Sequence, residues 1–212
     1  MPQLLTTSHI DKSFKYQGPQ QWTYDDYLRL PNDGNRYEII NGVLYMANAP
    51  SYDHQFTVSK LDRLIGGYVD QHQLGVVLVA PFEIHLSEIA KPVQPDVFFI
   101  ATKRQPKAGD KLFAGVPDLI IEVISKSSVR TDRVIKFAAY ELAGVREYWL
   151  VDPRFRFVEV YSLSSDTQEY GLEGQFGLGE QLHSIVLPDF TLEVESIFVP
   201  LAISVKSNFF SQ

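Results

Sequence analysis

Hydrophobic and polar positions follow two distinct rhythms along the chain, and these rhythms predict strands and helices. Short apolar runs rich in β-branched residues indicate strands, whereas the helical spacing of apolar positions after Pro50-Ser51 indicates a helix of about 20 residues. Asn41-Gly42 separates two of the strand runs and is typical of a type I′ hairpin turn, which needs two positive φ angles. The predicted elements are a capped short helix after Thr23, a hairpin at 36–46, a helix from Ser51, strands at 76–79, 82–86, 96–100 and 118–124 with a loop at 101–116, a helix at 131–142, and strands at 147–151, 157–161 and 169–171, with more near Ile185 and Leu192.

This order of elements predicts the fold class. A hairpin, a helix, several strands, a second helix and further strands indicate an α/β structure, in which a mixed central β-sheet is flanked by helices and carries additional β-strands. We expect one domain over residues 21–200, because the length of the chain suits a single core. Residues 1–20 and 201–212 are predicted to form an N-terminal arm and a C-terminal tail.

Composition narrows the expected cellular setting. The 212 residues include no cysteine, which excludes disulfides and thiolate metal sites and favours a cytoplasmic location. The N-terminal segment lacks the basic-then-apolar pattern of a secretory signal, and no apolar run approaches the length of a membrane span. We therefore expect a cytoplasmic protein with no membrane partner.

The formal net charge of −7 argues against a nucleic-acid partner, because phosphate binding relies on clustered lysine and arginine. Two local basic clusters weaken this objection, although such charge runs are more often an ordinary solvated surface. The clusters are Lys103, Arg104, Lys107 and Lys111, and Lys126, Arg130 and Arg133.

Glu122 is the most informative residue of the chain, because it interrupts the apolar run Leu119-Ile120-Ile121-Glu122-Val123-Ile124. Such a run predicts a central strand buried on both faces, where a charge is tolerated only when it is paired or binds a metal. Asp96 follows Pro95 at the start of another apolar run. Two carboxylates on adjacent core strands indicate a site for a hard cation, and the alternative is a structural ion pair with a buried lysine or arginine.

One kind of enzyme with two carboxylates on a divalent cation is a metal-dependent nuclease. Such an enzyme also needs a lysine near the attacking water, and the usual position of that lysine is two residues after the glutamate, on the same strand face. Here Ile124 occupies that position. Lys126 continues the strand parity, but the serines around it indicate that the strand has already ended. Lys136 is the preferred lysine, because Asp132, Lys136 and Tyr140 share one helical stripe that can face the preceding strand; the alternative is an ordinary helix ion pair.

Asp118 competes with Asp96 as the second carboxylate, since it also follows a proline. Two carboxylates four residues apart on one strand are separated by roughly 13 Å, too far to share a metal directly, so Asp118 is interpreted as a cap at the start of the strand. Glu38 lies beside Arg36 on the predicted hairpin, where an ion pair and a site role are equally plausible. His54, near a helix start, leaves a substrate role and a structural role open.

Six segments, taken in order, carry a resemblance to a known family: Tyr37-Glu38-Ile39-Ile40-Asn41-Gly42; His54 soon after a Pro-Ser; Pro95-Asp96-Val97; the run from Pro117 to Ser125; Asp132 with Lys136 and Tyr140; and the run from Ala143 to Pro153. Together they resemble the large bacterial family of "putative restriction endonucleases" within the PD-(D/E)XK nuclease superfamily. The resemblance covers roughly residues 22–198, and the set is specific although each segment alone is weak.

The resemblance implies a restriction-endonuclease-like core, hydrolysis of phosphodiester bonds and dependence on Mg²⁺ or Mn²⁺. Asp96 matches the Pro-Asp carboxylate of the family, and Glu122 matches its second acid. Lys136 matches a lysine displaced from the strand to the helix, and Glu38 matches the upstream acid. We expect the metal to be bound by Asp96, Glu122 and the carbonyl of Val123, and the substrate to be contacted by His54, Lys126 and Tyr140.

The leading hypothesis is thus a metal-dependent endonuclease that acts on nucleic acid, with DNA as the expected substrate. We also expect a homodimer, because the C-terminal strands offer exposed edges. One alternative is a catalytically inactive binding or structural module that keeps the nuclease fold, which the net charge of −7 and the missing strand lysine favour. Another is a metal-dependent hydrolase of a substrate other than nucleic acid.

Overall fold

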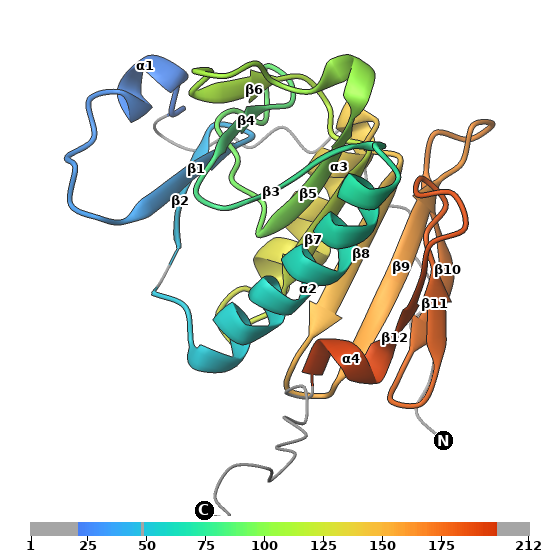
Figure 1. Ribbon diagram of the computed structural model, residues 1–212. Helices are drawn as coiled ribbons and strands as arrows, with labels where there is room; N and C mark the ends of the chain where they lie inside the picture. The colour runs from blue at the N-terminus through green and yellow to red at the C-terminus, as the bar shows by residue number, and fades with distance from the viewer. Residues whose placement is uncertain (1–20, 48, 199–212) are drawn as a thin grey trace, which may run out of the picture.

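A six-stranded mixed sheet forms the centre of the computed structural model, which describes residues 21–47 and 49–198 (Figure 1). In this sheet β7 and β8 are parallel, and every other neighbouring pair is antiparallel. The strands, in their order across the sheet, are β10 (Tyr170–Phe176), β9 (Phe157–Leu163), β8 (Glu147–Asp152), β7 (Leu119–Val123), β5 (Val97–Ala101) and β3 (Gly75–Val79). The predicted mixed α/β fold is confirmed.

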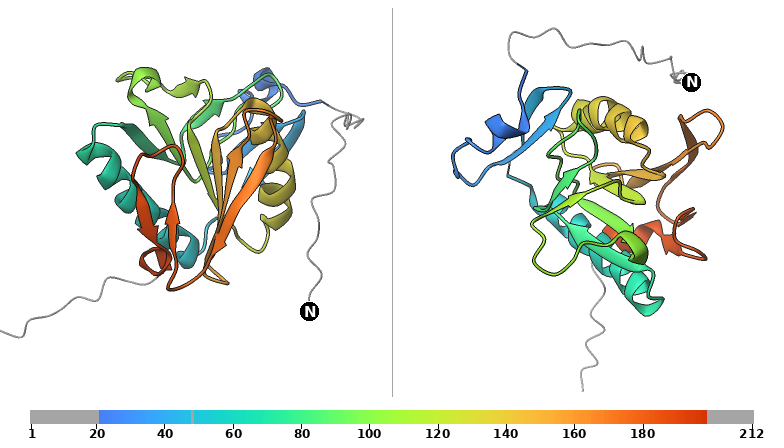
Figure 2. Two further views of the ribbon diagram at one scale, coloured as in Figure 1. Left: turned by 90° about the vertical axis from the view of Figure 1, so that its right-hand side faces the viewer. Right: turned by 90° about the horizontal axis from the view of Figure 1, so that it is seen from above.

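Helices cover both faces of this sheet, and the strand residues alternate between two hydrophobic clusters. The long helix α2 (Tyr52–Gln71) packs on one face, whereas η2 (Thr131–Lys136) and α3 (Phe137–Ala143) link the parallel strands across the other (Figure 2, right). Side chains of a strand point alternately to opposite faces. Ile121 therefore belongs to the cluster under α2, and Ile120 belongs to the cluster under α3.

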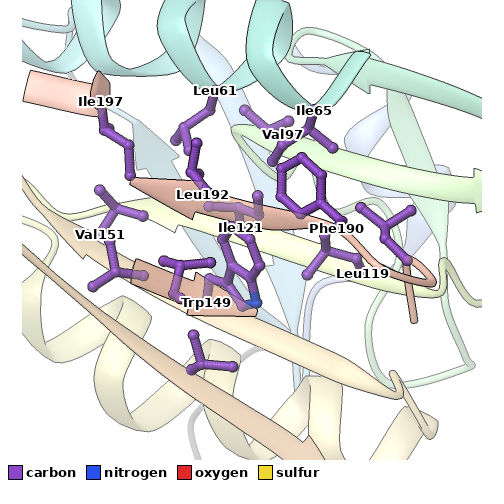
Figure 3. Packing of buried hydrophobic residues seen from close by; sticks show 14 of the residues in the cluster. Leu61, Ile65, Val97, Leu119, Ile121, Trp149, Val151, Phe190, Leu192 and Ile197 are labelled. Atoms are coloured by element: carbon purple, nitrogen blue, oxygen red, sulfur yellow. The ribbon is translucent and has the colours of Figure 1, made fainter. Parts of the chain in front are cut away.

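The cluster under α2 is shown in Figure 3. Leu61 and Ile65 from α2 meet Val97, Ile121 and Trp149 from three neighbouring strands, and all five side chains are buried. The C-terminal segment closes the same cluster through Phe190, Leu192 and Ile197. It comprises β11 (Gln181–His183), β12 (Thr191–Glu193) and α4 (Val194–Phe198).

The N-terminal elements form as the sequence predicts. Thr23 begins α1 (Tyr24–Tyr27) with a reciprocal capping box that involves Asp26. Asn41 and Gly42, with φ angles of 53° and 72°, turn the hairpin of β1 (Arg36–Ile40) and β2 (Val43–Ala47). Backbone hydrogen bonds between Ile39 and residues 91 and 92 then attach β1 to the rest of the fold, which fixes the position of its neighbour Glu38.

Two local expectations were wrong, and one element was not predicted. The predicted loop at 101–116 contains η1 (Thr102–Arg104) and β6 (Leu112–Ala114), which pairs in parallel with β4 (Glu83–His85). Ile185 lies between β11 and β12 rather than in a strand, because the buried carboxylate of Glu147 accepts hydrogen bonds from the backbone N–H groups of Ile185 and Val186. The helix α4 had no counterpart among the predicted elements.

The predicted N-terminal arm, residues 1–20, and C-terminal tail, residues 201–212, lie outside the described residues. Over residues 21–47 and 49–198, no helix combines the length and the apolar character that crossing a membrane requires.

Candidate active site

A single buried lysine lies between two buried carboxylates. The ammonium of Lys136 is 3.0 Å from Oε1 of Glu122 and 3.0 Å from Oε2 of Glu38, and each of the three residues is 6% exposed or less. The three side chains come from η2, β7 and β1, which are distant in sequence. The structure therefore brings together three of the residues that the sequence singled out.

The helix after β7 explains how the lysine reaches the strand. Residues 131–136 form a π-helix, a wider turn that is frequent at functional sites, and it continues directly into α3. Asp132 and Lys136 are the buried residues of this turn. One turn later the hydroxyl of Tyr140 donates a hydrogen bond of 2.7 Å to Oε1 of Glu122. The predicted stripe of Asp132, Lys136 and Tyr140 thus faces the core and not solvent.

Asp96 lies directly before β5, opposite Glu122. The register pairs Val97 with Ile121, so Asp96 and Glu122 are neighbours across the strands and share a face of the sheet. Oδ2 of Asp96 accepts a hydrogen bond of 2.9 Å from the backbone N–H of Val123 and lies 3.1 Å from Nε2 of His54.

Two further side chains hold these carboxylates in place. Arg36 on β1 places Nη2 3.7 Å from Oδ1 of Asp96, so it pairs with Asp96 and not with Glu38 as the sequence left open. Glu38 instead accepts a hydrogen bond of 2.7 Å from the backbone N–H of Gln94. His54 is fixed in the first turn of α2, where its backbone N–H donates to the N-cap residue Ser51. Sequence reasoning missed the contributions of Arg36 and Gln94, since both depend on the docking of the hairpin.

Burial and charge perturb the protonation of the site. Burial raises the pKa of Glu122 well above its usual value, and the Lys136 ammonium opposes that rise only in part. Burial would lower the pKa of Lys136, but Glu122 and Glu38 outweigh it and hold the pKa well above the ordinary lysine value. Burial likewise raises the pKa of Asp96, but the hydrogen bond and charge of His54 prevail, so the pKa is lowered.

Asp132 adds a fourth carboxylate to this region. Its side chain is buried, and burial raises its pKa to about 6 despite the opposing charge of Lys136. Repulsion by Asp96 contributes to the same rise in the pKa of Asp132. Four acidic groups therefore lie around Lys136, and they outnumber the basic groups that pair with them, which are Lys136, Arg36 and His54.

The remaining candidates lie further away. Lys126 is exposed beyond the end of β7, in a turn closed by hydrogen bonds between Ser125 and Ser128, so it adds no buried charge to the site. Asp118 lies at the other end of β7, where it accepts a hydrogen bond of 2.8 Å from the backbone N–H of Ala101 and pairs with Arg104. The interpretation of Asp118 as a residue that caps the start of the strand agrees with this geometry.

A cleft of about 260 Å³ opens beside Asp96. Its walls come from the β1–β2 hairpin, from the first turns of α2 and from the segment after β3. Arg36, Gln55 and Asp96 supply polar groups to the wall, so Asp96 is the site carboxylate that borders the cleft.

Comparisons with known proteins agree with this picture. Residues 24–195 match the sequence model of a family described as "Uma2: Putative restriction endonuclease". An uncharacterized protein of Synechocystis is 30% identical over 150 residues, which cover 69% of this chain and 83% of that protein. The crystal structure of a putative nuclease of the DUF820 family from Anabaena variabilis has the same fold, with a TM-score of 0.66 and 20% identity over 83% of this chain and 97% of the other.

Proposed function

Because the chain belongs to the Uma2 family of putative restriction endonucleases, we propose that it is a metal-dependent endonuclease that hydrolyses phosphodiester bonds of nucleic acid, with DNA as its substrate. The observation that carries this proposal is the buried arrangement of Lys136 between Glu122 and Glu38, with Asp96 held beside them. A lysine and convergent carboxylates are the groups that phosphodiester hydrolysis with a divalent cation needs.

The donor set suits Mg²⁺ or Mn²⁺. Over residues 21–47 and 49–198 no three His, Cys, Asp or Glu side chains form a metal-binding group, so two carboxylates need help from a carbonyl and from water, as is usual for Mg²⁺. Val123 can supply the carbonyl. Its N–H points to Asp96, and in a strand the N–H and C=O of one residue point to the same side. Asp96, Glu122 and Val123 are therefore the expected ligands.

Each neighbouring side chain has a definable task in this proposal. A bound divalent cation would acidify a water molecule and offset charge on the phosphate. The Lys136 ammonium would orient that water or stabilise the developing negative charge, and Glu38 would keep the ammonium in place through their 3.0 Å contact. Tyr140 restrains Glu122, and His54 restrains Asp96. Binding of the substrate would use the cleft beside Asp96.

Replacement of Glu122 by Gln tests the proposal. The amide keeps the shape of the side chain and an oxygen that can accept from Lys136 and Tyr140, so circular dichroism should show an intact fold. Cleavage of single-stranded and duplex DNA in Mg²⁺ or Mn²⁺ should disappear. Asp118→Asn is the matched control, because it neutralises a buried acid at the other end of the same strand and should retain cleavage. Full activity of Glu122→Gln would refute the assignment.

The alternative, an inactive module with the nuclease fold, predicts that the chain does not bind a divalent cation. One of its motives was the missing strand lysine, and the 3.0 Å contact of Lys136 with Glu122 weakens that motive. Isothermal calorimetry decides between the two, since the nuclease proposal requires binding of Mn²⁺ that Asp96→Ala weakens. Absence of binding at millimolar Mn²⁺ would favour the module.

A further inference from the structure

An exposed aromatic pair begins helix α2. The rings of Tyr52 and Phe56, four residues apart, are stacked with centroids 5.9 Å apart and an angle of 26° between their planes. Tyr52 is 76% exposed, the highest value among the large hydrophobic side chains of the described residues. The ammonium of Lys60 lies 5.6 Å from the centroid of the Phe56 ring, so a cation supports the inner ring of the pair.

A second aromatic pair lies around the turn between β8 and β9. Phe155 and Phe157 are stacked with centroids 6.5 Å apart and an angle of 24°. Phe155 is 71% exposed, and the guanidinium of Arg154 lies 5.4 Å from its ring centroid. This pair therefore repeats the combination found on α2, an exposed ring next to a cation.

Both pairs lie at the end of the sheet that carries the carboxylates. His54, in the same helical turn as Tyr52, contacts Asp96 at 3.1 Å. The turn with Phe155 follows β8, whose residue Val151 pairs with Val123 next to Glu122. Figure 1 shows the start of α2 and the β8–β9 turn at the same, lower end of the central sheet. Exposed basic residues lie at this end: Lys126, Arg130 and Arg156, together with Arg154, whose guanidinium is paired with Asp152.

Rings exposed beside cations are suited to one class of partner. Unpaired bases stack on aromatic side chains while the phosphate backbone follows basic groups, whereas the bases of a duplex already stack on one another. An aromatic protein-binding patch would not require the basic residues next to it.

We propose that Tyr52 and Phe155 form a stacking surface for single-stranded nucleic acid at the end of the sheet that carries the carboxylates. This inference rests on the proposed function for the identity of the substrate, and it specifies that the strand at the site is unpaired. Phe56 and Phe157 support the two outer rings, and the basic residues contact the phosphates.

Binding is measured apart from cleavage. Fluorescence anisotropy of a labelled oligothymidylate of about 12 nucleotides, in EDTA, is compared with that of a duplex of equal length. The full chain should bind the single strand more tightly. Tyr52→Ala and Phe155→Ala should each weaken that binding about 5- to 100-fold, because one base stack contributes roughly 1–3 kcal/mol. Tyr52→Trp should retain binding, and the oligonucleotide should quench its added fluorescence.

Leu142→Ala is the control, since Leu142 is 69% exposed but lies on α3 near the opposite end of the sheet, and it should bind normally. Equal affinity for duplex and single strand would overturn the proposal. Normal oligonucleotide binding by both alanine variants would also overturn it. If those variants bind the oligonucleotide normally but no longer self-associate, the two rings form a protein contact instead. Stacking-dependent binding without Mg²⁺-dependent cleavage by the native chain would refute the nuclease and leave the stacking surface standing. If both alanine variants cleave DNA at the native rate, only the stacking surface is refuted.

Discussion

Lys136→Met should destabilise the protein strongly and in a pH-dependent way. Methionine keeps most of the apolar length of the lysine but removes the ammonium that contacts Glu122 and Glu38 at 3.0 Å. Both carboxylates are buried, so they lose their cation without gaining water. Removing one partner of a buried ion pair costs about 3–5 kcal/mol, and we expect a loss of that size in the free energy of unfolding at pH 8.

The deficit should shrink in acid. Burial already raises the pKa of Glu122, and loss of the lysine charge raises it further. An unfolded glutamate titrates near pH ~4.3, so above that pH the folded variant binds more protons than its unfolded chain. The stability of the variant therefore falls as pH rises through this window and up to the folded pKa, and it falls further than that of the native chain, in which Lys136 lowers the pKa of Glu122. Each proton of difference changes the free energy of unfolding by about 1.4 kcal/mol per pH unit.

Urea denaturation of the native chain and the variant at pH 5 and pH 8 measures this effect. Lys126→Met is the control, because Lys126 is an exposed lysine near the same strand and its loss should change stability by no more than about 0.5 kcal/mol. A deficit below about 1 kcal/mol at pH 8, or a deficit equal at both pH values, would contradict the buried charge arrangement.

Three further outcomes are expected. Lys136→Met should lose DNA cleavage but bind Mn²⁺ at least as tightly as the native chain in calorimetry, because the expected ligands remain and a repelling cation is gone. Weaker binding would place Lys136 among the groups that build the metal site. Glu147→Gln should lower the free energy of unfolding by about 1–3 kcal/mol, because an amide cannot accept hydrogen bonds both from Trp149 and from residues 184–186. Urea denaturation measures this loss, and an unchanged midpoint would contradict it. Light scattering at micromolar concentration should give twice 24.1 kDa if the exposed edge strand β10 supports a homodimer, and a monomer would exclude it.

The strands and the two main helices could be predicted because their signals are local. The run that contains Glu122 predicted a buried strand, and Asn41-Gly42 predicted a tight turn, and both formed. The choice of Lys136 also followed from local rules, since helical spacing and the end of the strand are both visible in sequence. These residues meet in the structure as the spacing indicated.

Other features depend on contacts between distant segments, and no local pattern reports them. The pairing of β4 with β6 joins residues almost 30 positions apart, and both strands are only three residues long. The role of Arg36 was invisible for the same reason, since its partner Asp96 is brought to it by the docked hairpin. In the sequence Glu147 is an ordinary strand residue, and only the packing of the C-terminal segment shows that its carboxylate accepts hydrogen bonds from residues 185 and 186. Long-range packing, not propensity, decides such positions.

The charge balance of the site distinguishes a structural ion pair from a site that binds something. A structural pair needs one cation for each buried anion, because uncompensated buried charge is costly. Here Lys136 contacts both Glu38 and Glu122, Arg36 and His54 pair with Asp96, and Asp132 is buried nearby with a pKa of about 6. Burial raises the pKa of Glu122 and Asp132, and a divalent cation bound there would relieve the negative charge that Lys136, Arg36 and His54 leave unpaired. A fold that needed only a pair would gain stability by giving up the extra carboxylates, so their presence together supports a binding role for this end of the sheet.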